Sequence, residues 1–217
     1  MELYDQKLIE MFGGIAKEKQ LFFCHYCLQN DLDCRIEGEG KVYFGNETDH
    51  PMQVLGAYSN ASKNWSWEWA KAESSLPEYL SEQSKQIKAY GEKHGFGIFT
   101  TEQFPIEKDD LHYIGLAALG ISDSSGYCLA DYPAGTMCIT VNASDINKKF
   151  PNDHESIFTV FPGLVSEYEF NHREAFVNYL LKKHYKVDKK KSEVIGTKGK
   201  HKVKALFDDS DRLAELQ

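Results

Sequence analysis

Apolar and polar positions follow two different periods along the chain, and these periods predict its helices and strands. Apolar residues from Leu3 to Ile15 recur at helical spacing, which predicts a helix over residues 1–30 that is weakened in its middle by Gly13-Gly14. The segment Leu21–Leu28 is apolar on nearly every side, a pattern typical of either a buried helix or a strand. Periodicity leaves these two alternatives open.

The rest of the chain alternates between groups of strands and groups of helices. The predicted strands are Leu32–Ile36 and Lys41–Phe44 as a hairpin, Met52–Tyr58, Trp65–Trp69, Tyr127–Ala130 and Thr136–Val141 as a second hairpin, and Val194-Ile195 with Val203–Phe207 as a C-terminal hairpin. The predicted helices are Leu76–Tyr90 with stop signals at Gly91 and Gly95, one from Asp109 or Asp110 to Ile121, and the region 154–185, in which Asn171 begins a fresh helix.

This order of elements predicts an α+β fold, because it lacks the strict strand–helix alternation of a doubly wound parallel sheet. We expect an antiparallel sheet, made of a meander and hairpins, packed against several helices and followed by a C-terminal helix–hairpin segment. We expect residues 1–150 to form an α+β domain that contains the tryptophan-rich strand. Residues 151–217 would add the helical segment and the hairpin, packed on the same domain.

Composition narrows the class of protein. The chain has 217 residues, 41% of them hydrophobic and 13% aromatic, enough for a core without disulfides or metals. No window of about 18 apolar residues exists, so no spanning helix and no membrane partner are expected. The N-terminus lacks a secretion signal and the five cysteines are odd in number, which favours a soluble cytoplasmic protein. A net charge of −8 makes nucleic acid an unexpected partner.

The three tryptophans of the chain stand at alternate positions, Trp65, Trp67 and Trp69. On a strand they project from one face, with Ser66 and Glu68 on the other. The favoured interpretation is that this face packs into the core of the domain, since each ring buries a large area. The alternative is a stacking platform for a ligand. The residues predicted to bind that ligand are Tyr58, Trp65, Trp67 and Trp69, with His112 or Glu68 as polar groups.

The same segment carries a resemblance to a known family. Leu55-Gly56-Ala57-Tyr58-Ser59, followed by Trp65-x-Trp67-x-Trp69-Ala70, resembles the signature of a bacterial family of unknown function. Later segments similar to that family are Asn171–Ala175, Tyr179-Leu180 and Leu206–Asp208 with Arg212-Leu213, so the resemblance covers roughly residues 30–215. It implies a fold and a bacterial origin, and it brings no enzymatic activity.

Two short motifs invite a metal site. Cys24-His25-Tyr26-Cys27, with Cys34 farther on, has thiolates at a spacing that suits zinc, but a structural zinc site needs four ligands. The apolar surroundings instead predict buried, inert thiols. Glu169 and His172 have the spacing of a carboxylate and imidazole on one helix face, yet no second copy exists. We therefore expect a capped helix start with exposed His172 and Arg173, and no metal or cofactor.

Motifs for nucleotide binding or nucleophilic catalysis are absent from the sequence. There is no phosphate-binding loop of the GxxxxGK[ST] type, no GxGxxG after a strand and no Gly-x-Ser-x-Gly elbow. No catalytic residue is predicted.

Charge is concentrated in one segment. Residues 182–204 hold ten lysines and two acidic residues, a net of +8, against −16 for the rest of the chain. Such a segment is suited to an acidic or phosphate-rich partner, and Lys198, Lys200 and Lys202 are the predicted partner-binding residues. The plainer interpretation is an exposed helix end and a hairpin, in which lysines suit the helix dipole and protect a sheet edge.

Two functions of different classes follow from these patterns. The first is a non-enzymatic interaction module that binds another protein, by analogy with toxin-immunity proteins. The second is an enzyme or small-ligand binder with an aromatic cleft formed by the tryptophan-rich strand. A zinc-stabilised protein that uses Cys24, Cys27 and Cys34 is a third interpretation. The sequence leaves the oligomeric state open.

Overall fold

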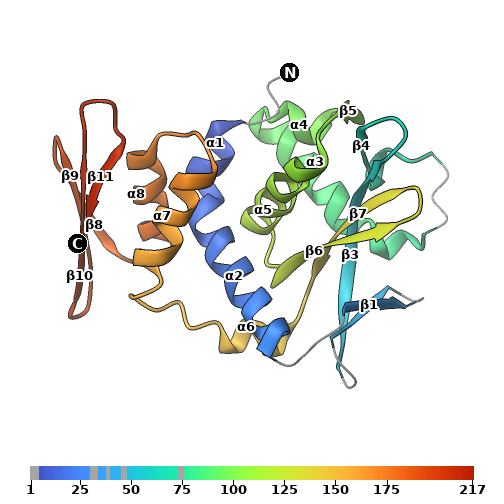
Figure 1. Ribbon diagram of the computed structural model, residues 1–217, viewed down its shortest axis with the longest axis horizontal. Coiled ribbons are helices and arrows are strands. Elements are labelled where there is room, and N and C mark those ends of the chain that lie inside the picture. The colour runs from blue at the N-terminus through green and yellow to red at the C-terminus, as the bar shows by residue number, and fades with distance from the viewer. Residues whose placement is uncertain (1–4, 30–33, 38–39, 45–47, 73–75) are drawn as a thin grey trace. The chain divides into compact units, whose positions relative to one another are not determined.

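The N-terminal helical segment supplies residues to both units into which the chain divides. A computed structural model describes residues 5–29, 34–37, 40–44, 48–72 and 76–217 (Figure 1). Within these, unit 1 holds residues 19–149, and unit 2 holds residues 5–18 together with 150–217. Unit 2 is therefore built from two stretches of chain that are far apart in the sequence.

The predicted N-terminal helix is helical over most of its length, but it changes its winding. It consists of α1 (Gln6–Leu8), a π-helical turn η1 (Ile9–Gly13) and α2 (Gly14–Gln29), so Leu21–Leu28 is a helix and not a strand. A Cβ atom at Gly14 would lie 2.5 Å from the ring of Tyr179. Glycine therefore permits a close helix–helix approach here and does not simply weaken the helix.

Unit 1 contains an antiparallel seven-stranded sheet, which confirms the α+β class. Its strands are β1 (Cys34–Glu37), β2 (Lys41–Phe44), β3 (Thr48–Ser59), β4 (Asn64–Trp67), β5 (Gln103–Pro105), β6 (Gly126–Tyr132) and β7 (Gly135–Val141). β3 is the centre of the sheet, because it pairs with β2, β4 and β7. The two predicted hairpins, β1–β2 and β6–β7, are confirmed, and the short strand β5 was not predicted.

Helices and short 3₁₀ turns complete unit 1. They are η2 (Glu68–Ala70), η3 (Glu78–Leu80), α3 (Glu82–His94), α4 (Gly97–Thr100), η4 (Lys108–Asp110), α5 (Leu111–Ile121) and α6 (Ser144–Lys149). The helix predicted from Leu76 therefore begins later, after η3. Gly95 ends α3 in the left-handed conformation, with φ of +77°, as predicted. The predicted stop at Gly91 is wrong, because this residue lies inside α3, where its missing side chain admits Phe99.

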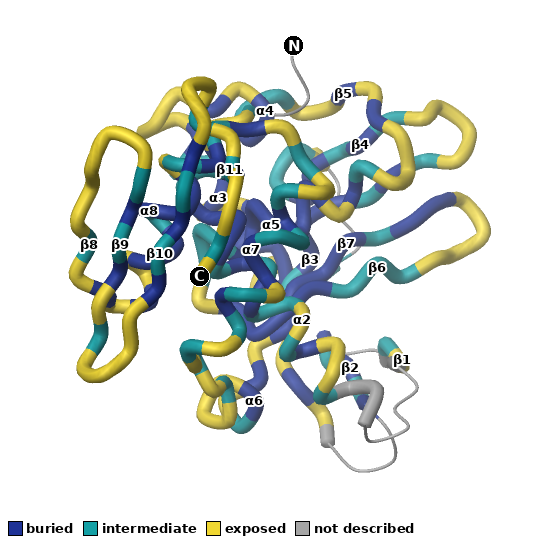
Figure 2. Tube along the Cα trace, turned by 60° about the vertical axis from the view of Figure 1, so that its left-hand side comes forward, coloured by how far each residue is buried: buried dark blue, intermediate teal, exposed yellow. Residues whose placement is uncertain are grey.

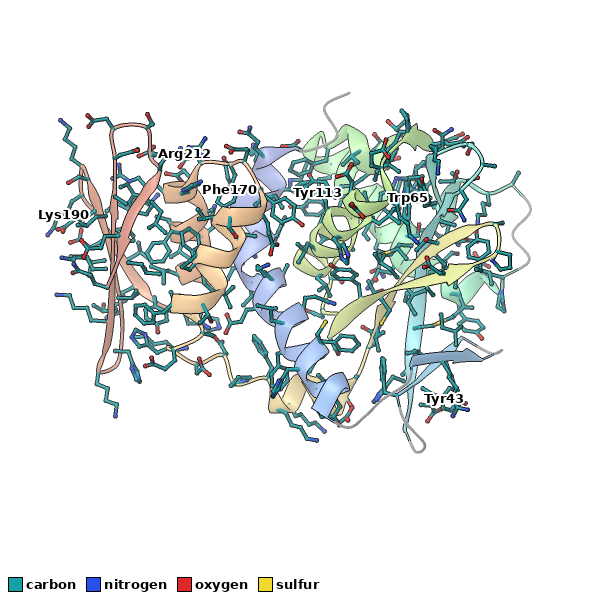
Figure 3. All side chains as sticks on the ribbon, in the orientation of Figure 1. Tyr43, Trp65, Tyr113, Phe170, Lys190 and Arg212 are labelled. Atoms are coloured by element: carbon teal, nitrogen blue, oxygen red, sulfur yellow. The ribbon has the colours of Figure 1, made fainter. Side chains whose placement is uncertain are left out.

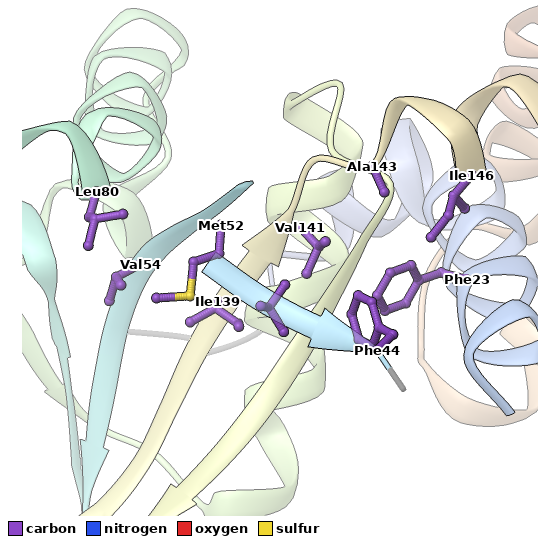
Figure 4. Packing of buried hydrophobic residues seen from close by; sticks show 10 residues of the cluster. Phe23, Phe44, Met52, Val54, Leu80, Ile139, Val141, Ala143 and Ile146 are labelled. Atoms are coloured by element: carbon purple, nitrogen blue, oxygen red, sulfur yellow. The ribbon is translucent and has the colours of Figure 1, made fainter. Parts of the chain in front are cut away.

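The core of unit 1 lies between the sheet and its covering segments. Figure 4 shows the apolar side chains that meet there. They come from α2 (Phe23), the strands (Val42, Phe44, Met52, Val54, Ile139, Val141), η3 (Leu80), Ala143 and α6 (Ile146). A buried polar contact fixes α3 on the sheet beside them. The Gln83 side chain donates to Ser124 at 2.7 Å and accepts from Thr140, so these polar groups are satisfied inside the unit.

Unit 2 packs helices against one face of a second antiparallel sheet. Besides α1, η1 and the start of α2, its elements are α7 (Ile157–Glu167), α8 (His172–Lys182), β8 (Lys186–Lys189), β9 (Glu193–Lys198), β10 (His201–Phe207) and β11 (Leu213–Leu216). The strand order is β11-β10-β9-β8. The ring of Phe176 in α8 lies 6.1 Å from that of Phe207 in β10. The predicted two-stranded C-terminal hairpin is thus the centre of a four-stranded sheet. Both flanking strands have only four residues, and β8 is also mostly charged, which hides them in the sequence.

The predicted helix start at Asn171 is confirmed. The Asn171 side chain accepts a hydrogen bond from the backbone N–H of Glu174 at 2.9 Å, as an N-cap does. Pro162 was predicted either to kink this helical region or to begin a helix. It lies inside α7, so it does not begin the helix.

A glycine in the centre of unit 1 gives a test of this packing. We expect Gly56→Ala to lower the free energy of unfolding of unit 1 by about 1–3 kcal/mol, because the added Cβ would meet the backbone of Ser66 and the Trp65 ring, 2.6 Å away. Gly97→Ala is the matched control, since nothing lies within 4 Å of its Cβ position. Urea unfolding followed by tryptophan fluorescence measures both, and equal effects would contradict the packing described.

Candidate functional site

The tip of the β9–β10 hairpin in unit 2 gathers positive charge. Lys198 pairs with His201 in the sheet register, so Gly199 and Lys200 alone make the turn. Gly199 has φ of +60°, a conformation that favours glycine. Lys200, His201 and Lys202 are exposed, and the yellow tube of Figure 2 follows this loop. The predicted partner-binding residues therefore lie together at one end of the sheet.

The three predicted lysines surround the tip and do not share one face. The Lys198 side chain turns toward the helices, and its Nζ lies 5.6 Å from the centre of the Tyr185 ring. Lys202 points to the opposite face of the sheet, since positions alternate along a strand. Blue-tipped side chains, Lys190 among them, surround this sheet in Figure 3.

Among the described residues, some lysines of the sheet are ion-paired, whereas those of the tip are not. Nζ of Lys189 lies 3.5 Å from the Glu174 carboxylate, and Nζ of Lys190 lies 2.7 Å from the Glu193 carboxylate. Within the described part of the chain, no carboxylate lies within ion-pair distance of Lys198, Lys200 or Lys202. The exposed ammonium groups of Lys200 and Lys202 are therefore available to a partner, and Lys198 adds positive charge beside Tyr185.

A histidine–tyrosine cluster lies beneath the tip. His154, in the segment before α7, has its Nδ1 atom 2.8 Å from the hydroxyl of Tyr185. The His201 ring lies 4.8 Å from the His154 ring, centre to centre. Burial lowers the pKa of His154, and the like charge of His201 lowers it further. This arrangement brings two imidazoles into contact next to the lysine tip.

A buried ionic network lies deeper in unit 2. Lys183, at the end of α8, is 0% exposed and its Nζ lies 2.5 and 2.8 Å from the two carboxylate oxygens of Glu18 on α2. The hydroxyls of Ser156 and Tyr179 donate to the same carboxylate at 2.6 and 2.7 Å. Every oxygen of the buried carboxylate is thus satisfied, as a buried charge requires.

The chemistry of this network favours a structural role. Burial lowers the pKa of Lys183, and the Glu18 carboxylate opposes that change. Burial and the same carboxylate raise the pKa of the Tyr179 hydroxyl well above its usual range. The Ser156 hydroxyl lies 3.2 Å from Nζ of Lys183, a spacing that suits a nucleophile and its base. However, the Ser156 hydroxyl donates its hydrogen bond to the Glu18 carboxylate and Lys183 is fully buried, so the contact joins segments of the fold.

The predicted ligand-binding residues of unit 1 lie in its core. Trp65 and Trp67 are 0% exposed, and Tyr58 is 2% exposed. The rings of Trp65 and Trp67 meet edge to face at 5.2 Å, and Nε1 of Trp67 donates to the carbonyl of Ile98 at 2.9 Å. These contacts support the core interpretation of the two rings, and the ligand role stays a prediction.

The strand predicted for Trp65–Trp69 ends two residues early. After Trp67 the chain enters η2, so Trp69 does not continue the alternating row. Glu68 is buried, and its carboxylate pairs with Nζ of Lys71 at 2.6 Å. The ring of Trp69 is half-buried, with Nζ of Lys88 4.1 Å from its centre. An ion pair that closes the turn therefore replaces the outward position expected for Glu68.

His112, the predicted polar partner of the tryptophans, has another contact. It is exposed on α5, and its Nδ1 atom lies 2.8 Å from the hydroxyl of Tyr127 on β6. This contact joins the helix to the sheet.

The structure describes the side chain of Cys24 from the predicted cysteine motif. Cys24 is exposed, which corrects the predicted burial of its thiol, and partial desolvation raises its pKa. The side chains of Cys27 and Cys34 lie outside the described residues. In the described part of the chain, no cluster of three or more His, Cys, Asp or Glu residues could hold a metal ion. No helix in that part is long and apolar enough to cross a membrane.

His172 is buried, although an exposed residue was predicted. Its Nδ1 atom accepts a hydrogen bond from the backbone N–H of Leu213 at 3.0 Å, and its ring packs on Phe170. The helix start therefore contacts the strand β11, which the sequence pattern did not reveal. Burial and the neighbouring Arg212 guanidinium lower the pKa of His172.

Glu18, Ser156, Lys183, His154 and Tyr185 were not among the predicted site residues. A signal for two of them exists in the sequence. Lys183 follows Tyr179 by four positions and so falls on the apolar stripe of its helix. Glu18 falls between Ile15 and Phe22 in the same way. A charge on an apolar stripe indicates a buried partner of opposite charge.

Comparison with known proteins identifies a family match for part of the chain. A family model for a family of unknown function matches residues 6–144. The tryptophan segment lies within this match, whereas the later segments named in the sequence resemblance and the β9–β10 hairpin lie beyond it. No curated protein and no solved structure matches the chain.

The buried network predicts which single substitution damages unit 2. We expect Lys183→Met to cost about 3–5 kcal/mol, because it leaves the Glu18 carboxylate buried without its cation. The double variant E18L/K183M should recover most of that loss, and Lys182→Met, an exposed neighbour, should cost under about 1 kcal/mol. Urea unfolding followed by far-ultraviolet circular dichroism measures all three, while tryptophan fluorescence follows unit 1. A double variant as unstable as K183M would contradict the role of the pair.

The neutral state of His172 predicts a pH dependence of stability. The pKa of His172 is lower in the folded chain than the usual value of about 6.5. The contribution of its neutral ring to the free energy of unfolding is therefore complete above about pH 6.5 and declines as the pH falls toward the folded-state pKa. His172→Asn keeps an acceptor near the position of Nδ1 but does not titrate. We expect thermal unfolding between about pH 7.5 and 5 to show a smaller loss for H172N than for the wild type. An unchanged slope would contradict this assignment.

Proposed function

The chain belongs to DUF6882, a family of unknown function, and we propose that it is a protein-interaction module whose β9–β10 hairpin docks an acidic surface of another protein. The observation that carries this proposal is the set of three lysines at the tip, Lys198, Lys200 and Lys202, without an ion-pair partner in the described residues. The hairpin lies outside the matched residues, so the proposal draws on the chain's own geometry and not on the family.

The plainer explanations for surface lysines account for only part of the charge at this tip. Lysines protect the exposed edges of sheets, an explanation that fits Lys198 and Lys202, because β8 reaches only Thr197 of β9 and pairing beside β11 reaches only Lys204 of β10. Lysines also suit the C-terminus of a helix, an explanation that fits Lys182 at the end of α8. Neither explanation fits Lys200 in the turn, where its charge adds repulsion to the tip, and this favours a binding role.

The hairpin is anchored beneath its tip, which supports the proposal. It is paired on both sides below Thr197 of β9 and from Lys204 of β10, and the buried side chains of Val194, Val203 and Phe207 anchor the sheet. A preformed surface loses little conformational freedom on binding, so modest electrostatic contacts suffice for affinity. The aromatic-cleft alternative has no comparable support, because Tyr58, Trp65 and Trp67 are almost fully buried.

Charge reversal at the tip tests the proposal. We expect the protein to bind a fluorescent, aspartate-rich peptide, and K200E/K202E to weaken that binding by about tenfold or more at low salt, because each reversed lysine replaces attraction with repulsion. The double variant K93E/K148E changes the net charge equally on exposed lysines of unit 1 and should bind nearly as the wild type does. Fluorescence anisotropy measures each affinity.

Two outcomes would contradict this function. Equal losses in the two double variants would show attraction by net charge alone. The second is a comparison with single-stranded DNA of the same length and charge as the peptide. If the protein binds this DNA as tightly as the peptide, its ligand is a phosphate-rich molecule and not an acidic protein.

A further inference from the structure

Two histidines lie next to the lysine tip, on the face of the hairpin that carries Lys198. His201 is the first residue of β10, directly after the turn, and it is exposed. His154 is half-buried and comes from a different segment, yet its ring lies 4.8 Å from that of His201. The Tyr185 hydroxyl holds Nδ1 of His154, so this ring is fixed while its other nitrogen remains for a further contact.

The charged groups around the pair favour an anion. Lys198 of β9 lies over the Tyr185 ring, and Lys183 of α8 acts on His154 as a nearby positive charge. Asp153 and Glu155, the chain neighbours of His154, act in the opposite sense. The Glu18 carboxylate of α2 is already bound by Lys183. The lysines and paired imidazoles therefore make this position unfavourable for a metal cation and suitable for a carboxylate.

We propose that His154 and His201, in their protonated state, bind a carboxylate of the acidic partner, so that docking on the hairpin strengthens as the pH falls below neutral. This inference rests on the proposed function, and it adds a specific contact and a regulation to the lysine surface. Without a partner, charging both rings places two like charges side by side. A carboxylate of the partner that contacts both charged rings offsets the repulsion between them.

The direction of the pH effect follows from linkage. Burial and His201 together hold the pKa of His154 below its usual range in the free protein. A bound carboxylate favours the charged imidazole and raises that pKa, so binding takes up protons. Affinity must then increase as the pH falls through the interval between the two values.

Peptide affinity at several pH values tests this inference. With the same aspartate-rich peptide and about 0.15 M salt, we expect wild-type affinity to rise about three- to tenfold between about pH 8 and 5.5. The peptide stays ionised in this range, since Asp titrates near pH 4. His201→Gln and the double variant H154Q/H201Q should lose most of the rise. His25→Gln, an exposed histidine on α2, should keep it.

The outcomes separate this inference from the proposed function. The histidine site is overturned if lysine-dependent binding at about pH 8 does not strengthen on acidification, or if the rise in affinity survives in H201Q. Either outcome leaves the docking hairpin standing. Absence of peptide binding at every pH overturns both. His201→Gln keeps the test valid if the double variant fails to fold, because His201 is exposed and its replacement leaves the His154–Tyr185 contact in place.

Discussion

The organisation of unit 2 depends on one buried ion pair, that between Glu18 and Lys183. The carboxylate comes from α2 and the ammonium group from the end of α8, and Ser156 joins the start of α7 to the same centre. Removing two charges from water is costly, so such a pair is weak grounds for great stability. We expect its main contribution to be specificity, because a packing that separates the two groups and still keeps them from water leaves a charge buried alone. The register of α2 against α8, including the approach of Gly14 to Tyr179, is fixed in this way.

A series of contacts leads from this ion pair to the surface of unit 2. α8 packs Phe176 against the sheet and ends next to Lys183, so the helix supports both the sheet and the ion pair. Tyr185 follows two residues after Lys183, and its hydroxyl contacts Nδ1 of His154. The lysine tip is the outermost part of that chain of contacts. Close packing below and unpaired charge above are the two properties on which the proposed docking role rests.

Much of the fold follows from sequence patterns, and the failures have physical causes. The α+β class, the two hairpins of unit 1 and the cap at Asn171 were predictable because periodicity and capping are local signals. The end of β4 was not, since Trp69 fits the alternation and only the burial of Glu68 with Lys71 breaks it. The lysine tip was visible as charge. Its histidines were not, because the contact of His154 with His201 joins segments that no local pattern relates.

The discontinuity of unit 2 has a consequence for biosynthesis. A ribosome releases Glu18 long before it adds Lys183, so the nascent chain carries an unmatched carboxylate on an emerging helix while all of unit 1 is translated. Unit 1 can therefore fold vectorially, during elongation, whereas unit 2 must await the last third of the message. Until then the amino-terminal segment lacks the rest of unit 2, against which Leu8, Ile9 and Phe12 are buried, and exposed apolar surface of this kind is what molecular chaperones protect.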